Sequence, residues 1–280
     1  MLAYDFDYYL PDTWQEAVQI YDAVSKQGLK PYYYGGGTEI ISMSRVFNVK
    51  PNAVIDIKSI PECCGIGTDG THISFGAAAP LNEIIQTDLF PLLSLAAGRI
   101  ADHTVRSRLT LGGNLCGTII YRETLMPLLL ANAEIDIAST GGTKTVSAAE
   151  VFSNGSRPQS GELIVRVTVD KNAAARPCYH IKRSKTEKIG YPLTTVCALF
   201  TNSTVSLAAS GLCGYPFRFA DIRTDGLPPA ADIAAQLADQ IPAPVLDDIE
   251  GSAGYRLFIF KKTIEKLINE YSQSRGNNNA

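Results

Sequence analysis

Three consecutive glycines, Gly35–Gly37, are the residues of this sequence best suited to bind a ligand, and Thr38 and Glu39 follow them directly. Because glycine has no Cβ, its backbone can adopt positive φ and come close to a bound molecule. Consecutive N–H groups in such a loop can point at the oxygens of a pyrophosphate, and the Thr38 hydroxyl can add a donor. Taken alone, the glycine triplet is equally consistent with an unliganded turn.

A second glycine turn, Thr110–Asn114, reads Thr-Leu-Gly-Gly-Asn and offers a hydroxyl, two glycines and an amide. Two such turns can hold one extended dinucleotide from two sides, and the pair is far more specific than either turn alone. Neither turn has the Gly-Lys-Ser/Thr ending of a Walker A loop. A Rossmann fingerprint requires a glycine where Ile40 stands, and no alternating strand–helix pattern follows to build a doubly wound sheet.

The elements around the first turn suit a phosphate site. Thr13, with Glu16 three residues later, forms a capping box that starts a helix, and Gly28 ends it. The sequence then predicts a strand over 30–34 that leads into the glycines and a helix that begins at Thr38. A strand, a glycine loop and a helix N-terminus in succession are typical of anion binding.

Further strands and helices follow along the chain. We predict strands over 53–57, 64–67, 72–76, 135–138, 144–146 and 163–169, and helices over 80–85, 90–101 and 124–133. Beyond a loop-like stretch at 170–177, we predict strands over 178–183, 193–201 and 204–212, then helices over 228–241 and 254–271. Strands followed by helices indicate an α+β domain. We therefore divide the chain into domains 1–172 and 173–280.

Composition excludes several classes of protein. The 280 residues carry a net charge of −3, so no basic field is available for nucleic acid. No apolar run reaches the length of a membrane span, and the acidic, aromatic N-terminus lacks a signal peptide, so we expect a cytoplasmic protein. The six cysteines form no Cys-x-x-Cys pair and the three histidines are far apart, which predicts no metal site on this chain.

Together the motifs resemble the medium, FAD-binding subunit of the xanthine dehydrogenase and carbon monoxide dehydrogenase family of molybdenum hydroxylases. That family carries an Ala-Gly-Gly-Thr-Asp/Glu loop and, downstream, a Thr-Ile-Gly-Gly-Asn turn. The likeness covers nearly the whole chain and continues in four later segments, namely 127–134, 162–164, 181–182 and 247–256. The resemblance implies an α+β fold, in which a two-part FAD-binding domain of the vanillyl-alcohol oxidase or PCMH type precedes a small α+β C-terminal domain.

The resemblance also implies a role. FAD would be the cofactor of an electron-transfer subunit that takes electrons from the iron–sulfur clusters of a small [2Fe–2S] subunit and passes them to NAD or another acceptor. The substrate would be oxidised on a large molybdopterin-binding subunit, in a dimer of heterotrimers. This chain would then hold no catalytic side chain of its own. Two alternatives stay open, a stand-alone flavin-dependent oxidoreductase of the same fold and a non-catalytic scaffold subunit.

By position, the resemblance assigns cofactor contacts to nineteen residues in five groups. The pyrophosphate and ribityl chain would contact Tyr33, Tyr34, Gly35, Gly36, Gly37, Thr38, Glu39 and Ile40. The flavin pocket would include Ile100 and Ala101. The other side of the dinucleotide would meet Thr110, Gly113, Asn114 and Gly117. The ribose region would meet Glu123 and Thr124. The flavin ring would meet Ile164, Lys182 and Tyr191, with a core strand tyrosine as the alternative for Tyr191.

The sequence departs from the family pattern in one loop and one longer stretch. Thr124 stands where the family has an aspartate, and Glu123 precedes it, so the acidic contact is expected to shift by one residue. Tyr121 and Arg122 replace small residues in the same loop. The stretch 183–191 is longer than the family's usual Arg-x-x-Asp segment.

Overall fold

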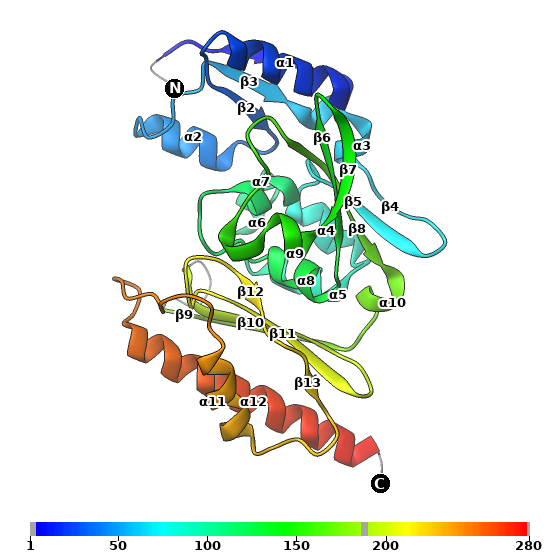
Figure 1. The fold of residues 1–280 in the computed structure, drawn as a ribbon, viewed down its shortest axis with the longest axis vertical. Coiled ribbons are helices and arrows are strands. Elements are labelled where there is room, and N and C mark those ends of the chain that lie inside the picture. The colour runs from blue at the N-terminus through cyan, green and yellow to red at the C-terminus, as the bar shows by residue number, and fades with distance from the viewer. Residues whose placement is uncertain (1–3, 186–189, 279–280) are drawn as a thin grey trace.

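Three β-sheets succeed one another along the residues described by a computed structural model, 4–185 and 190–278 (Figure 1). The first is a small parallel sheet in the order β1-β3-β2, formed by Asp7–Tyr9, Ala53–Asp56 and Pro31–Tyr34. Helix α1 (Trp14–Lys26) links β1 to β2 and is capped by Thr13, as predicted. Helix α2 (Thr38–Arg45) links β2 to β3, so the glycine triplet lies at the carboxyl edge of this sheet.

The second sheet is antiparallel in the order β4-β5-β8-β6-β7. Its strands are Ile66–Thr68, His72–Gly76, Leu163–Asp170, Glu134–Ser139 and Gly142–Ser147. Between β5 and β6 the chain forms α4 (Leu81–Thr87), α5 (Pro91–Gly98), α6 (His103–Arg106), α7 (Leu111–Cys116) and α8 (Leu125–Leu130). Shorter helical segments are Ile57–Ser59, α3 (Pro61–Cys64), α9 (Ala148–Val151), Ser153–Gly155 and α10 (Lys171–Ala174).

The third sheet is also antiparallel, with strands β9 (Cys178–Ser184), β10 (Pro192–Phe200) and β11 (Thr204–Ser210). Strands β12 (Phe217–Arg218) and β13 (Ile222–Arg223) both pair with β11. Helices α11 (Ala230–Asp239) and α12 (Ala253–Asn278) cover one face, and α5 and α8 lie on the other (Figure 1). Every residue of β10 is buried because the strand has protein on both faces.

One hydrophobic core joins the second and third sheets. Cys197, Leu199 and Ala208 of the third sheet belong to the same buried cluster as Leu93 of α5 and Leu129 of α8. The opposite face of the third sheet packs its own cluster against α11 and α12. The predicted boundary at 172–173 falls within α10, between the two sheets, and the division into two domains stays a prediction.

The structure corrects the second glycine motif. Thr110–Asn114 is not a turn but the capped start of helix α7, because the Thr110 hydroxyl accepts a hydrogen bond from the Gly113 N–H at 3.2 Å. The last helix also runs further than predicted, to Asn278. No helix within 4–185 and 190–278 is long and apolar enough to cross a membrane.

Candidate functional site

The first glycine loop is held in place by close contacts that only glycine permits. Gly37 has a φ of 68° and is the N-cap residue of α2, and a Cβ there would lie 2.1 Å from the Tyr34 ring. A Cβ on Gly36 would lie 1.5 Å from the carbonyl oxygen of Arg108, and one on Gly35 would lie 2.7 Å from Thr110 Oγ1. The loop therefore rests directly on the segment that precedes α7.

The N-terminus of α2 presents free hydrogen-bond donors. The first hydrogen bond of this helix runs from the Ile41 N–H to the Gly37 oxygen at 2.8 Å. In the described part of the chain no acceptor is found for the N–H groups of Thr38, Glu39 and Ile40, and no side chain caps the helix. Unpaired N–H groups and the helix dipole together favour a bound anion at this position.

The N-terminus of α7 differs, because its donors are already used. The Leu111 and Gly112 N–H groups donate to the oxygens of Ala79 at 3.0 Å and Ala77 at 2.8 Å, and that of Gly113 donates to Thr110. The N-terminus of α7 therefore offers fewer free donors to an anion than the N-terminus of α2 does. The second motif instead packs against the first loop, where Thr110 lies next to Gly35. Gly113 is exposed, so a ligand can still approach its backbone.

Glu39 joins the two motifs. Its Oε1 accepts hydrogen bonds from the Thr118 N–H at 2.7 Å and the Thr118 hydroxyl at 2.5 Å. Gly117 lies against the same carboxylate, since a Cβ there would sit 2.8 Å from Glu39 Oε2. Asn114 Oδ1 in turn accepts from the Thr124 hydroxyl at 2.6 Å. Glu39 and Thr124, both predicted to contact a ligand, are thus engaged within the protein.

Lys58 is a cation at the glycine loop that the sequence analysis missed. Its Nζ donates to the Gly35 oxygen at 3.0 Å and to Asp56 at 2.7 Å, and it lies 4.4 Å from the centre of the Tyr34 ring. Asp56 also accepts from the Tyr8 hydroxyl at 2.6 Å. The sequence did hold one signal for Lys58. Asp56 ends β3, and β3 pairs in parallel with β2, so residues just after β3 lie at the same edge of the sheet as the glycine loop after β2.

The two predicted tyrosines of β2 face opposite ways. The Tyr34 ring lies against Gly37. Tyr33 stacks on Tyr21 of α1, with ring centroids 4.8 Å apart, and its hydroxyl donates to the Gly161 oxygen at 2.9 Å. Burial raises the pKa of the Tyr33 phenol. The Tyr33 side chain is therefore committed to packing on the far side of the sheet from the loop.

A second group of predicted residues meets where the α5–α8 region packs on the third sheet. Lys182 Nζ donates to Glu123 Oε2 at 2.9 Å and to the Arg99 oxygen at 2.9 Å. The Thr195 hydroxyl donates to Glu123 Oε1 at 2.9 Å. Glu123 was expected at the ribose region. It points instead into the third sheet, because both of its oxygens find donors there. We call this group, formed by Arg99, Glu123, Lys182 and Thr195, the junction cluster.

Three neighbours complete the surroundings of the junction cluster. Ile100 and Ala101 follow Arg99, and their oxygens accept from Arg106 Nη1 at 3.1 and 2.7 Å. His180 is buried on β9, and neither ring nitrogen hydrogen-bonds another described residue. Burial, together with the nearby cations Arg99 and Lys182, lowers the pKa of His180 to about 3. His180 is therefore neutral at physiological pH.

The last two predicted residues differ in exposure. Ile164 is buried in the core on β8 and offers little surface to a ligand. Tyr191 precedes β10, is 51% exposed, and stacks on Tyr121 with centroids 4.9 Å apart. The alternative of a core strand tyrosine is therefore wrong for Tyr191.

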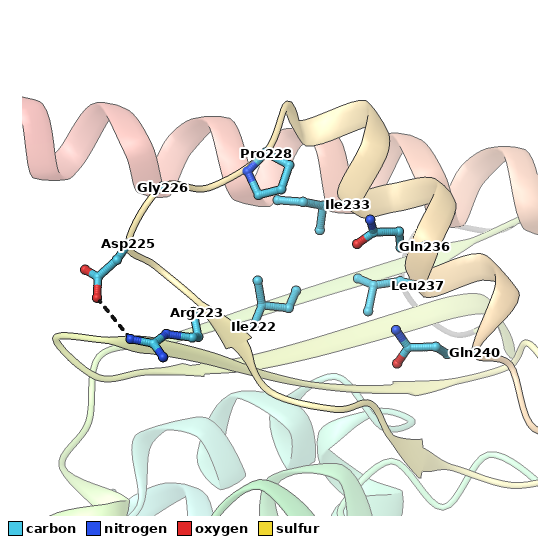
Figure 2. A pocket seen from close by; sticks show the side chains of 9 residues that line it. All are labelled: Ile222, Arg223, Asp225, Gly226, Pro228, Ile233, Gln236, Leu237 and Gln240. Carbon is cyan, nitrogen blue, oxygen red and sulfur yellow. Dashed lines mark ion pairs between the residues drawn. The ribbon is translucent and has the colours of Figure 1, made fainter.

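A cavity of about 220 Å³ lies elsewhere, between β13, the following loop and α11 (Figure 2). Its walls combine apolar side chains, such as Ile222, Ile233 and Leu237, with polar ones, and Arg223 pairs with Asp225 at 3.8 Å. All of its lining residues belong to the C-terminal part of the chain, and none is a predicted site residue. The glycine loop is the better candidate site, because it combines free donors with a glycine backbone.

Comparisons with known proteins identify the family of this chain. A family model described as the FAD binding domain in molybdopterin dehydrogenase matches residues 4–171. The glyceraldehyde dehydrogenase medium chain of Sulfolobus acidocaldarius is 25% identical over 95% of this chain and 98% of its own. The carbon monoxide dehydrogenase medium chain of Hydrogenophaga pseudoflava is 25% identical over 94% of this chain and 96% of its own.

The fold agrees as well. The solved structure of quinoline 2-oxidoreductase from Pseudomonas putida 86 superimposes with a TM-score of 0.82 at 22% identity. The alignment covers 98% of this chain and 99% of that one. At this identity the likeness concerns the fold, and it confirms the predicted fold class along almost the whole chain.

Proposed function

Because this chain belongs to the family of FAD binding domains in molybdopterin dehydrogenases, we propose that it carries electrons through a bound FAD inside a molybdenum hydroxylase. FAD is the cofactor, and the chain is an oxidoreductase subunit. Both curated relatives described above are named as medium chains, which supports assembly with a large and a small subunit. The proposed electron path runs from iron–sulfur clusters of the small subunit, through FAD, to NAD or another acceptor.

The observation that carries the proposal is the N-terminus of α2. The N–H groups of Thr38, Glu39 and Ile40 have no acceptor among the described residues, and the preceding glycines carry no side chains to cover the backbone. A diphosphate carries oxygens that accept such N–H groups and a negative charge that suits the helix N-terminus. The residues present therefore fit the diphosphate of FAD. Lys58 adds a cation beside Gly35.

The remaining predicted contacts lie along a path away from this loop. Glu39 binds Thr118, Asn114 binds Thr124, and Glu123 binds Lys182. The segment 114–124 thus runs from the glycine loop to the junction cluster. An extended dinucleotide whose diphosphate lies at α2 would direct its flavin ring toward the junction cluster. We therefore place the ring near Lys182, Ala101 and Tyr191.

The flavin supplies the redox chemistry when bound, and the protein orients and tunes it. In this arrangement the α2 N–H groups hold the diphosphate, and Asn114 Nδ2 has no acceptor among residues 4–185 and 190–278, which leaves it available to the ligand. The Lys182 ammonium favours the negative charge that the flavin gains on reduction. Tyr191 offers an exposed ring that can cover the flavin.

The experiment is affinity isolation of the full chain from its native cells. We expect FAD in the purified complex, a molybdopterin-binding partner and a [2Fe–2S] partner, with flavin absorbance that bleaches when the clusters are reduced. A chain that purifies without partners, yet whose flavin is reduced by a substrate, would favour the stand-alone oxidoreductase. A complex without flavin absorbance would contradict the proposal and favour a scaffold.

A further inference from the structure

Glu123 is a buried carboxylate whose two oxygens both bond to the third sheet. Oε2 lies 2.9 Å from Lys182 Nζ, and Oε1 accepts from the Thr195 hydroxyl at 2.9 Å. The exposed fractions of the side chains are 6% for Glu123 and 12% for Lys182. Glu123 comes from the segment that precedes α8, whereas its partners lie on β9 and β10. The carboxylate therefore fixes one lysine at the contact between two parts of the fold.

Lys182 retains a free donor. A lysine ammonium has three N–H groups. Within 4–185 and 190–278, Lys182 Nζ has two acceptors, Glu123 Oε2 and the Arg99 oxygen. A third N–H of this almost buried cation has no acceptor in that part of the chain, and the ring nitrogens of the adjacent His180 have no hydrogen bond to another described residue. Two neighbouring polar groups without partners indicate that a polar ligand atom approaches the junction cluster.

Retaining this ion pair has an energetic cost. Removing two charges from water costs several kcal/mol per ion, by rough estimate, and a buried pair is often no more stable than apolar residues of the same size. The burial cost is visible in Glu123, where desolvation raises the pKa despite the opposing effect of Lys182. Stability alone therefore gives little reason to place a lysine and a glutamate here. Control of the lysine's position and charge is a better reason.

We propose that Glu123 partly offsets the charge of the Lys182 ammonium at the flavin ring, and so lowers the flavin reduction potential relative to Lys182 alone. The proposal rests on the proposed function, in which the flavin ring lies at the junction cluster. It gives Glu123 a role different from the ribose contact expected from its sequence position.

The two charges make opposite contributions, and this separates the proposal from a merely structural role. A cation near the flavin stabilises the charge gained on reduction, whereas an anion destabilises it. Lys182→Met should therefore make the flavin harder to reduce, and Glu123→Gln should make it easier to reduce. Both variants break the same ion pair. If the pair only held the two parts of the fold together, both variants would shift the potential in the same direction.

The experiment measures the flavin reduction potential in the full FAD-loaded chain within its complex, by equilibration with a reference dye. We expect shifts of opposite sign for K182M and E123Q, each about tenfold in the equilibrium constant for reduction, or about 30 mV for a two-electron couple. Thr195→Val is the comparison variant. It removes one hydrogen bond to Glu123 Oε1 but keeps the carboxylate, so it should shift the potential less than E123Q does. Lys182→Arg keeps the charge and should largely retain the wild-type potential.

Three results would overturn the proposal. The first is a shift of the same sign in K182M and E123Q. The second is a shift in T195V as large as that in E123Q, since the charge of Glu123 would then be irrelevant. The third is loss of FAD from E123Q while T195V retains it, because Glu123 would then serve binding rather than tuning. Absence of flavin from the unmodified complex would instead contradict the proposed function, and with it the premise of this proposal.

Discussion

Gly37 and Gly28 adopt nearly the same left-handed backbone, with φ of 68° and 76°, but their surroundings differ. A Cβ on Gly37 would lie 2.1 Å from the Tyr34 ring, whereas a Cβ on Gly28 would meet nothing within 4 Å. Gly37 also directly precedes the free N–H groups of α2. Replacing each of the two glycines therefore distinguishes the folding cost of a left-handed alanine from the effect on FAD binding at the glycine loop.

We expect Gly37→Ala to weaken FAD binding at least about tenfold, which corresponds to about 1.4 kcal/mol of binding free energy. The added methyl group would displace the Tyr34 ring and the loop, and so move the α2 N–H donors. Gly28→Ala should cost about 1 kcal/mol of folding stability, from left-handed strain alone, and leave FAD affinity unchanged. Equilibrium dialysis and thermal unfolding measure the two quantities. Equal FAD affinity in both variants would show that the loop conformation is not needed for binding.

At the residue scale, local motifs were predictable and long-range partners were not. The glycine loop could be identified because its motif lies in a few consecutive residues and does not depend on distant ones. The direction of Glu123 could not, because it depends on Lys182, which lies 59 residues later. Lys58 was missed for the same reason, since its contact with Gly35 arises only when β2 and β3 pair.

At the scale of elements, α2 and α7 both follow a glycine motif, but only α7 has protein acceptors for its first N–H groups in the described part of the chain. Helix α2 begins at a glycine without a side-chain cap, whereas α7 is capped by Thr110 and its first N–H groups bond to the segment after β5. The sequence predicted a turn at Thr110–Asn114, because two glycines disfavour a helix by about 1 kcal/mol each. The cap and the bonds to Ala77 and Ala79 override that preference.

Removing the cap tests the supporting role of α7. We expect Thr110→Val to cost about 1 kcal/mol of stability through loss of the N-cap, and also to weaken FAD binding, because Thr110 contacts Gly35 of the loop. Thr13→Val removes the equivalent cap from α1 and should cost similar stability without affecting FAD. Thermal unfolding and FAD titration of both variants distinguish the cases. Unchanged FAD affinity in T110V would mean that α7 does not position the loop.

At the scale of the whole molecule, the strands and their antiparallel partners were largely predictable, because hairpins such as β4–β5, β6–β7 and β10–β11 pair neighbours in sequence. The packing of the third sheet on α5 and α8 was not. It depends on buried residues such as Cys197 and Leu199, which are apolar on a strand buried on both faces. Because both faces of the strand are apolar, the sequence shows no alternation that would indicate which face packs against which element.

In the proposed FAD site, the N-terminal N–H groups of α2 form one end and the junction cluster forms the other. The segment 114–124 connects these ends through Thr118 and Thr124. In this proposal, residues before and after the 172–173 boundary both contribute to the site. A single bound FAD should contact residues from both parts.

The most direct measurement is the crystal structure of the full chain with FAD bound. We expect diphosphate oxygens within hydrogen-bonding distance of the Thr38, Glu39 and Ile40 N–H groups, and a flavin ring next to Lys182. A diphosphate bound instead at the N-terminus of α7, or a flavin ring remote from the junction cluster, would contradict this expectation.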